Sequence, residues 1–188
     1  MAPFDYLSVL ISIVLGLSIT QVLGGFASMV RARGRLTFYW PHIVQMLGLF
    51  LINVQVWWAL FSLRFLHHWT FAGFFVILMQ PVTLYLMSAF LVPEIAAGER
   101  MDLREFYFRE KNWFFAATLG TLMASLTKDF FVLNGPMSTA DFTGHAIFIA
   151  LSFAGLLSNR DWVHKTIAPA TLAAYCIYIG LLFLRLPG

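Results

Sequence analysis

Six long apolar stretches constrain the fold of this chain more than any other feature of its sequence. They lie at residues 6–30, 38–66, 70–93, 112–133, 139–158 and 162–185. A helix needs about 20 apolar residues to cross the hydrocarbon core of a bilayer, which is about 30 Å thick. Charged residues make up only 11% of the chain, whereas soluble domains contain about a quarter. The sequence therefore predicts an all-α fold, a polytopic transmembrane bundle of about six helices that forms a single domain.

The composition also argues against several function classes. The basic residues that give the net charge of +3 fall in short loops between the apolar stretches, where they set orientation in a membrane. We therefore expect membrane lipid, and no nucleic acid, as a partner. The single cysteine, Cys176, allows no intrachain disulfide and no cysteine metal cluster. The sequence patterns of serine hydrolases, zinc peptidases and phosphate-binding loops are missing, so a non-enzymatic role is favoured.

The lysines and arginines are distributed unequally between the two sides of the predicted bundle. Three lie on one side, Arg64, Lys128 and Arg185. Nine lie on the other side: Arg31, Arg33, Arg35, Arg100, Arg104, Arg109, Lys111, Arg160 and Lys165. Because cytoplasmic loops carry the excess of Lys and Arg, this pattern predicts that both termini are extracytoplasmic. The expected location is a cell membrane, specifically a bacterial inner membrane.

The longest loop, residues 94–111, carries charges of both signs and is predicted to form a cytoplasmic amphipathic segment. Asp102 can cap a helix in which Leu103, Phe106 and Tyr107 form an apolar stripe. This segment is expected to be an interfacial helix that leads into the fourth span. The alternative is a docking surface for a cytoplasmic partner.

The first span contains a stripe of small residues that predicts close helix packing. Ser12, Gly16, Thr20 and Gly24 recur at every fourth position, a spacing that lets two helix backbones approach each other in lipid. Two alternatives remain open at this point. The stripe packs on the fourth helix or another neighbour within the chain, or it forms the seam of a homo-oligomer.

The deep polar residues are uncharged and provide the candidate site. Pro81 cannot donate to the Ile77 carbonyl, which leaves an acceptor close to Gln80. The candidate substrate or pore residues are Asn53, Gln55, Gln80, Pro81, Thr121 and Tyr175. They are expected either to line a small polar cavity at the midplane or to join helices by hydrogen bonds. The charged residues fall near helix ends, where Lys128 and Asp129 are expected to pair and Ser138-x-x-Asp141 to form a capping box.

Five histidines allow one cofactor hypothesis, a b-type haem held between two imidazoles. His42 and His164 are predicted at one depth, and His145 at the depth of His67 or His68. No other cofactor and no metal site is predicted.

Three functions are compatible with these features. The first is a protein that binds or conducts a small solute or ion at a neutral polar site near the midplane. The alternative is a non-catalytic accessory or oligomeric subunit of a larger membrane complex. The third is electron transfer through a haem with two histidine ligands.

Overall fold

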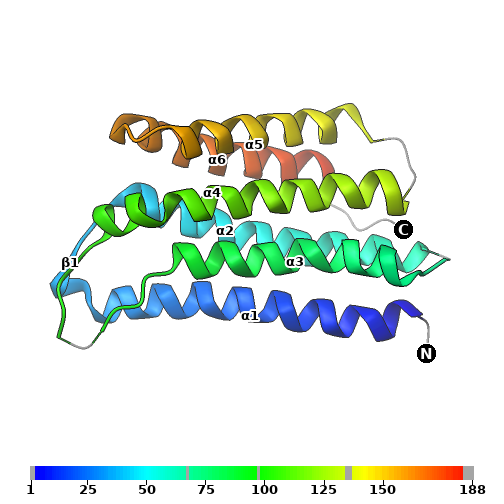
Figure 1. Ribbon diagram of the computed structural model, residues 1–188, viewed down its shortest axis with the longest axis horizontal. Helices are drawn as coiled ribbons and strands as arrows, with labels where there is room; N and C mark the ends of the chain where they lie inside the picture. Colours follow the sequence, from blue (N-terminus) through cyan, green and yellow to red (C-terminus); the bar gives the residue numbers. More distant parts are fainter. Residues whose placement is uncertain (1–2, 67, 97, 134–136, 184–188) are drawn as a thin grey trace.

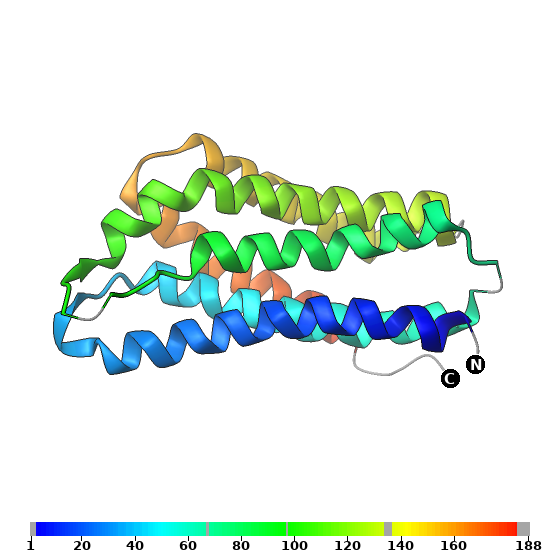
Figure 2. The ribbon, with the colours of Figure 1, turned by 60° about the horizontal axis from the view of Figure 1, so that its bottom comes forward.

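The computed structural model describes residues 3–66, 68–96, 98–133 and 137–183, which form an elongated bundle whose consecutive helices run in opposite directions (Figures 1 and 2). The helices are α1 (Pro3–Arg31), α2 (Trp40–Ala59), α3 (Phe71–Leu91), α4 (Leu103–Lys128), α5 (Thr139–Leu157) and α6 (Asp161–Leu182). Short turns follow three of them, namely η1 (Arg33–Arg35), η2 (Leu60–Phe65) and η3 (Asp129–Leu133). In the described residues six helices are long and apolar enough to cross a membrane, which confirms the predicted all-α class and the predicted number of such helices.

The two ends of the bundle differ in charge. Helix α1 begins and α6 ends at one end, which we call the terminal end (Figure 1). The connections from α1 to α2, from α3 to α4 and from α5 to α6 lie at the other end, and they carry the nine clustered Lys and Arg residues or lie next to them. We call this the basic end. Arg64 and Lys128 lie toward the terminal end, and Arg185 lies outside the described residues.

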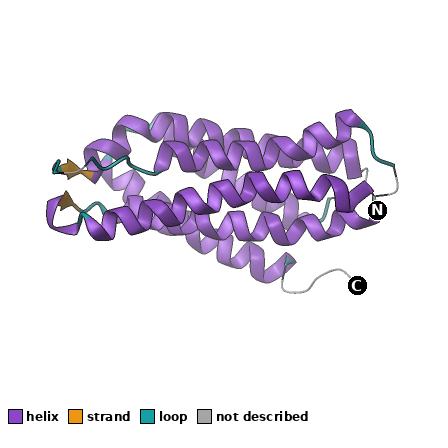
Figure 3. Ribbon diagram, turned by 90° about the horizontal axis from the view of Figure 1, so that it is seen from below, coloured by secondary structure: helices purple, strands orange, loops and turns teal. Residues whose placement is uncertain are grey.

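A short pair of strands joins two connections at the basic end. Strand β1 (Leu36–Thr37) pairs in parallel with β2 (Met101–Asp102), as Figure 3 shows. Strands of two residues carry no periodicity, so no pattern in the sequence indicated them. The predicted cap at Asp102 is confirmed, because its carboxylate accepts hydrogen bonds from the backbone N–H groups of Arg104 (2.7 Å) and Glu105 (3.3 Å).

Helix α4 begins earlier than the predicted fourth span, which starts at residue 112. The amphipathic part of the 94–111 segment is the first part of α4, and its stripe of Leu103, Phe106 and Tyr107 is buried. Lys111 is also buried, and its ammonium group donates to the carbonyl oxygens of Leu156 (3.0 Å) and Gly155 (3.4 Å). A cation at this position compensates the negative end of the α5 dipole. The charges that indicated a loop therefore lie on a helix whose other face is packed.

The small-residue stripe of α1 lies on the exposed face of the bundle. Ser12, Gly16, Thr20 and Gly24 are exposed, and a methyl group added at Gly16 or Gly24 would meet nothing within 4 Å. The buried face contacts α3 and α2 and consists of Ile11, Leu15, Ser18, Val22, Gly25 and Met29. Packing of the stripe within the chain, on α4 or another helix, was therefore a wrong prediction. The side chains of the buried face are larger than those of the stripe, so they give the contact with α3 and α2 more dispersion energy. The Ser18 hydroxyl also donates a hydrogen bond to the Leu84 carbonyl (3.2 Å).

Gly24 and Gly25 offer a matched test of this helix orientation. A Cβ at Gly25 would lie 2.6 Å from Val92 and 3.2 Å from Met46. Gly25→Ala is expected to lower stability by about 1 to 3 kcal/mol through overpacking. Gly24→Ala is expected to leave stability unchanged or raise it by up to about 1 kcal/mol, because alanine favours the helix. Thermal unfolding in detergent measures both, and equal effects would contradict the buried face assigned to α1.

Candidate functional site

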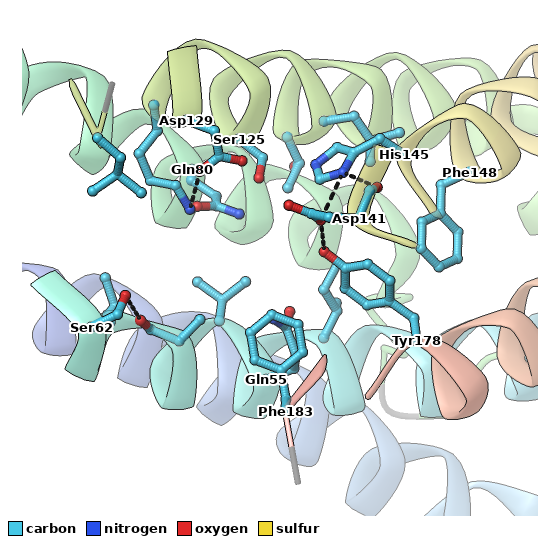
Figure 4. Close-up of a pocket in the computed structure, with 18 of the residues that line it drawn as sticks. Gln55, Ser62, Gln80, Ser125, Asp129, Asp141, His145, Phe148, Tyr178 and Phe183 are labelled. Carbon is cyan, nitrogen blue, oxygen red and sulfur yellow. Dashed lines mark hydrogen bonds and ion pairs between the residues drawn. The ribbon is translucent and has the colours of Figure 1, made fainter. Parts of the chain in front are cut away.

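A cavity of about 190 Å³ lies toward the terminal end and is lined by residues of α2, α3, α4, α5 and α6 (Figure 4). It reaches the surface at Ser62, which is exposed. Its polar lining consists of Gln55, Ser62, Gln80, Thr121, Ser125, Lys128, Asp129, Asp141, His145, Tyr175 and Tyr178. The cavity is therefore both polar and charged, whereas the sequence predicted a neutral site.

Four of the six predicted site residues line this cavity, namely Gln55, Gln80, Thr121 and Tyr175. Thr121 joins α4 to α3, since its hydroxyl lies 2.9 Å from the Thr83 hydroxyl. Among the described residues, the side-chain amides of Gln55 and Gln80 have no hydrogen-bond partner. These two amides are free to bind water or a solute in the cavity.

The other two predicted residues lie outside the cavity lining. Asn53 is fully buried, and its amide nitrogen donates to the Leu49 carbonyl of the same helix (2.8 Å). Residues two apart on a helix point about 200° apart, so Asn53 and Gln55 occupy different faces of α2. Pro81 is buried inside α3, which continues through it. Depth in the bundle does not determine the direction in which a side chain points, and the direction around the helix places these two residues away from the cavity.

Asp141 holds the charged wall of the cavity together. Its carboxylate accepts a short hydrogen bond from the Tyr178 hydroxyl (2.5 Å) and lies 3.2 Å from Nδ1 of His145 (Figure 4). Nδ1 also lies 3.0 Å from the Asp141 backbone carbonyl. These contacts fix the imidazole, and the other ring nitrogen of His145 points away from Asp141 on the side of Ser125 (Figure 4).

The local sequence explains how this cluster forms. Ser138 caps α5 by accepting a hydrogen bond from the Asp141 N–H (3.1 Å), as predicted. In a complete capping box the Asp141 carboxylate would also accept a hydrogen bond from the Ser138 N–H. Here that carboxylate contacts His145 and Tyr178 instead. Gly144 lets the Tyr178 ring approach α5, since a Cβ at Gly144 would lie 2.6 Å from that ring. From the sequence, His145 was named only as a possible haem ligand and Asp141 only as part of a capping box, and Tyr178 was missed. The i,i+4 spacing of Asp141 and His145 was a usable signal for their pairing.

The predicted ion pair lies at the end of α4, on the same side of the cavity as Asp141 and His145 (Figure 4). Nζ of Lys128 lies 3.5 Å from the Asp129 carboxylate, and both side chains are mostly buried. Asp129 begins the π-helical turn η3 at the end of α4. Because a charge buried alone is costly, the two charges are placed as a pair.

The cavity ends at Ile52 and Tyr175, which also line a second pocket of about 20 Å³. The Tyr175 ring stacks on Phe148 with centroids 4.2 Å apart. A pocket of this size holds about one water molecule. Tyr175 therefore stands between the larger cavity and the interior nearer the basic end.

The histidines predicted as haem ligands are engaged elsewhere. The two ring nitrogens of His164 lie 2.9 Å from the Tyr107 hydroxyl and 2.9 Å from the Ser158 carbonyl, and His42 Nε2 lies 2.7 Å from the Leu91 carbonyl. The geometry at the basic end does not fit a haem, because His164 has no nitrogen left for iron. At the other depth His145 pairs with Asp141, His68 is exposed, and His67 lies outside the described residues. Within the described ranges, no three His, Cys, Asp or Glu side chains gather as a metal site.

Comparison with protein-family models, with curated proteins and with solved structures finds no match to this chain. The function is therefore argued from the cavity itself.

Proposed function

We propose that this chain is a multi-pass membrane protein that binds a small polar solute in the cavity at its terminal end. The observation that carries the proposal is the pair of unpartnered amides, Gln55 and Gln80, facing one cavity beside a charged cluster. Gln80 is mostly buried and Gln55 is half-buried, and polar groups in such positions normally bond to protein or to ordered water. A solute or water that bonds to these amides supplies the missing partners.

The volume of the cavity limits the solute to a small molecule. Pockets for drug-sized ligands measure about 300 to 1,000 Å³, and an engineered cavity of about 150 Å³ binds benzene. The volume of about 190 Å³ suits a molecule of a few non-hydrogen atoms. The exposed Ser62 at its edge gives such a solute a way in.

Binding is better supported than free permeation. A path toward the basic end leads past Tyr175 into a pocket of about 20 Å³, which admits about one water molecule. Conduction of a larger solute would require Tyr175 and Phe148 to move apart. We therefore place solute binding first and treat passage as a further step that depends on this movement.

The proposed orientation follows from the distribution of basic residues. The nine clustered Lys and Arg residues belong to the basic end, and the positive-inside rule places such an end in the cytoplasm. The cavity then opens on the extracytoplasmic side of a cell membrane, and both termini lie on that side.

The first test compares the two amides of the cavity with the amide outside it. Methylammonium, acetamide and acetate serve as cationic, neutral and anionic probes in calorimetric titrations of the full chain in detergent. At least one probe is expected to bind. Gln55→Leu and Gln80→Leu are each expected to raise its dissociation constant by up to about tenfold, because that factor corresponds to the free energy of one hydrogen bond. Asn53→Leu serves as the control and is expected to leave binding unchanged.

The melting temperature of each variant is measured beside its binding. Gln55→Leu and Gln80→Leu break no hydrogen bond between described residues, so both are expected to melt like the wild type. If the wild-type chain binds none of the three probes, the proposed function fails.

A second candidate function, an oligomeric subunit of a membrane assembly, is favoured by one observation. The α1 stripe is exposed, and the space beside Gly16 and Gly24 is open. Stripes of this kind let helices associate closely in lipid. Under this hypothesis α1 contacts a second copy of the chain or another membrane subunit.

Size-exclusion chromatography in detergent tests the self-association form of this candidate. The wild type is expected to elute as an oligomer, and Gly16→Leu is expected to shift it toward the monomer by forcing the helices apart. Leu17→Ala changes a neighbouring exposed residue and serves as the control that keeps the wild-type profile. Identical profiles for both variants would contradict a seam along the stripe.

A further inference from the structure

We infer that the solute bound in this cavity is a small monovalent organic ammonium ion, and that it competes with a proton on His145. This inference rests on the proposed function and specifies its substrate class. It follows from the charges that face the cavity, the aromatic rings around them, and the unpartnered nitrogen of His145.

The charge balance of the cavity favours one positive charge. Lys128 and Asp129 form an ion pair and cancel each other formally. Asp141 then leaves the cavity with a net negative charge as long as His145 is neutral. Its bonds from Tyr178 and His145 hold the carboxylate in place without cancelling its charge. A bound monovalent cation brings the cavity to neutrality.

The aromatic lining favours an organic cation over a bare metal ion. Phe148, Tyr175, Tyr178 and Phe183 all contribute to the cavity, and Figure 4 shows the rings of Phe148, Tyr178 and Phe183 around the charged cluster. Aromatic faces attract ammonium groups, whereas hard metal ions require a shell of oxygen ligands. The amide oxygens of Gln55 and Gln80 remain available to accept hydrogen bonds from N–H groups of the ligand.

His145 provides the site for the competing proton. Its side chain is 6% exposed and lines the cavity. Nδ1 is held by Asp141, and Nε2 has no partner among the described residues. A proton from solvent on Nε2 turns the imidazole into a cation, so the net charge of the cavity rises to zero. The protonated ring then repels an ammonium ion in the same cavity.

Other titratable groups also face the cavity around His145. Lys128 and Asp129 come from α4 and its final turn, Asp141 from α5, and Tyr175 and Tyr178 from α6. Lysine, aspartate and tyrosine ordinarily titrate far from pH 6 to 7, whereas histidine ordinarily titrates near 6.5. The proton competition is therefore expected to follow His145.

Calorimetric titration with methylammonium at constant ionic strength tests the inference. The full chain in detergent is compared at about pH 8.5 and about pH 5, on either side of the ordinary range of histidine. An alkylammonium probe stays charged at both values, as a lysine side chain does. The dissociation constant for the wild type is expected to be about tenfold or more higher at the lower pH, because two cations then share the cavity.

Two histidine variants decide which group takes the proton. His145→Gln leaves Asp141 in place and is expected to bind methylammonium with the same affinity at both pH values. His68→Gln changes an exposed histidine that does not line the cavity and is expected to keep the wild-type pH dependence. Asp141→Asn is expected to lose methylammonium binding, and its melting temperature is recorded because Asp141 also holds His145 and Tyr178.

The possible failures point to different parts of the account. Binding of acetamide without binding of methylammonium would overturn the ammonium assignment and leave solute binding standing. Equal methylammonium affinity of the wild type at both pH values, or the same pH dependence in His145→Gln, would overturn proton competition. If the wild type binds none of methylammonium, acetamide and acetate, the proposed function is overturned together with this inference.

Discussion

The hydrogen bond from the Tyr178 hydroxyl to the Asp141 carboxylate links α6 to α5 and fixes the wall on which the site depends. It is possible because Gly144 has no side chain to separate the two helices. The same carboxylate orients His145 through Nδ1, so one acidic residue sets the position of two others. Without this contact the cavity would lose its charged wall, while the contact between α3 and α4 would remain.

The pairing of the charged groups in the cavity explains how an apolar chain tolerates them. An isolated charge within a membrane costs several kcal/mol. Lys128 pairs with Asp129, and Asp141 accepts donors from Tyr178 and His145. The cavity groups without a partner among the described residues are neutral, namely the amides of Gln55 and Gln80, the hydroxyls of Ser125 and Tyr175, and one nitrogen of His145. A bound solute that satisfies these groups adds stability only when it is present, which is the expected behaviour of a binding site.

Length and hydropathy are local properties, and they were sufficient to predict the six helices. The residue types at the helix starts were sufficient to predict the capping residues Asp102 and Ser138. They do not determine which face of a helix is buried. Helix α1 is apolar almost all round, so its small stripe and its large side chains were both possible contact faces, and the structure selects the large ones. Gln55 was found by its depth, and Gln80 by its depth and its place beside Pro81. Asn53 and Pro81 lie outside the cavity lining, because depth ignores direction around the helix. Tyr178 was missed because its role exists only when α6 packs on α5.

Thiol modification in intact cells tests the central claim most directly, since that claim is a polar cavity inside the bundle that opens on the extracytoplasmic side. Ser125 lines the cavity, whereas Ser18 is fully buried between α1 and α3. In a Cys176→Ala background, a small cationic methanethiosulfonate that does not cross membranes is expected to modify the Ser125→Cys variant and to leave the Ser18→Cys variant unmodified. If the Ser125→Cys variant reacts only after the cells are lysed, or does not react at all, the cavity does not open to the extracytoplasmic side and the account is contradicted.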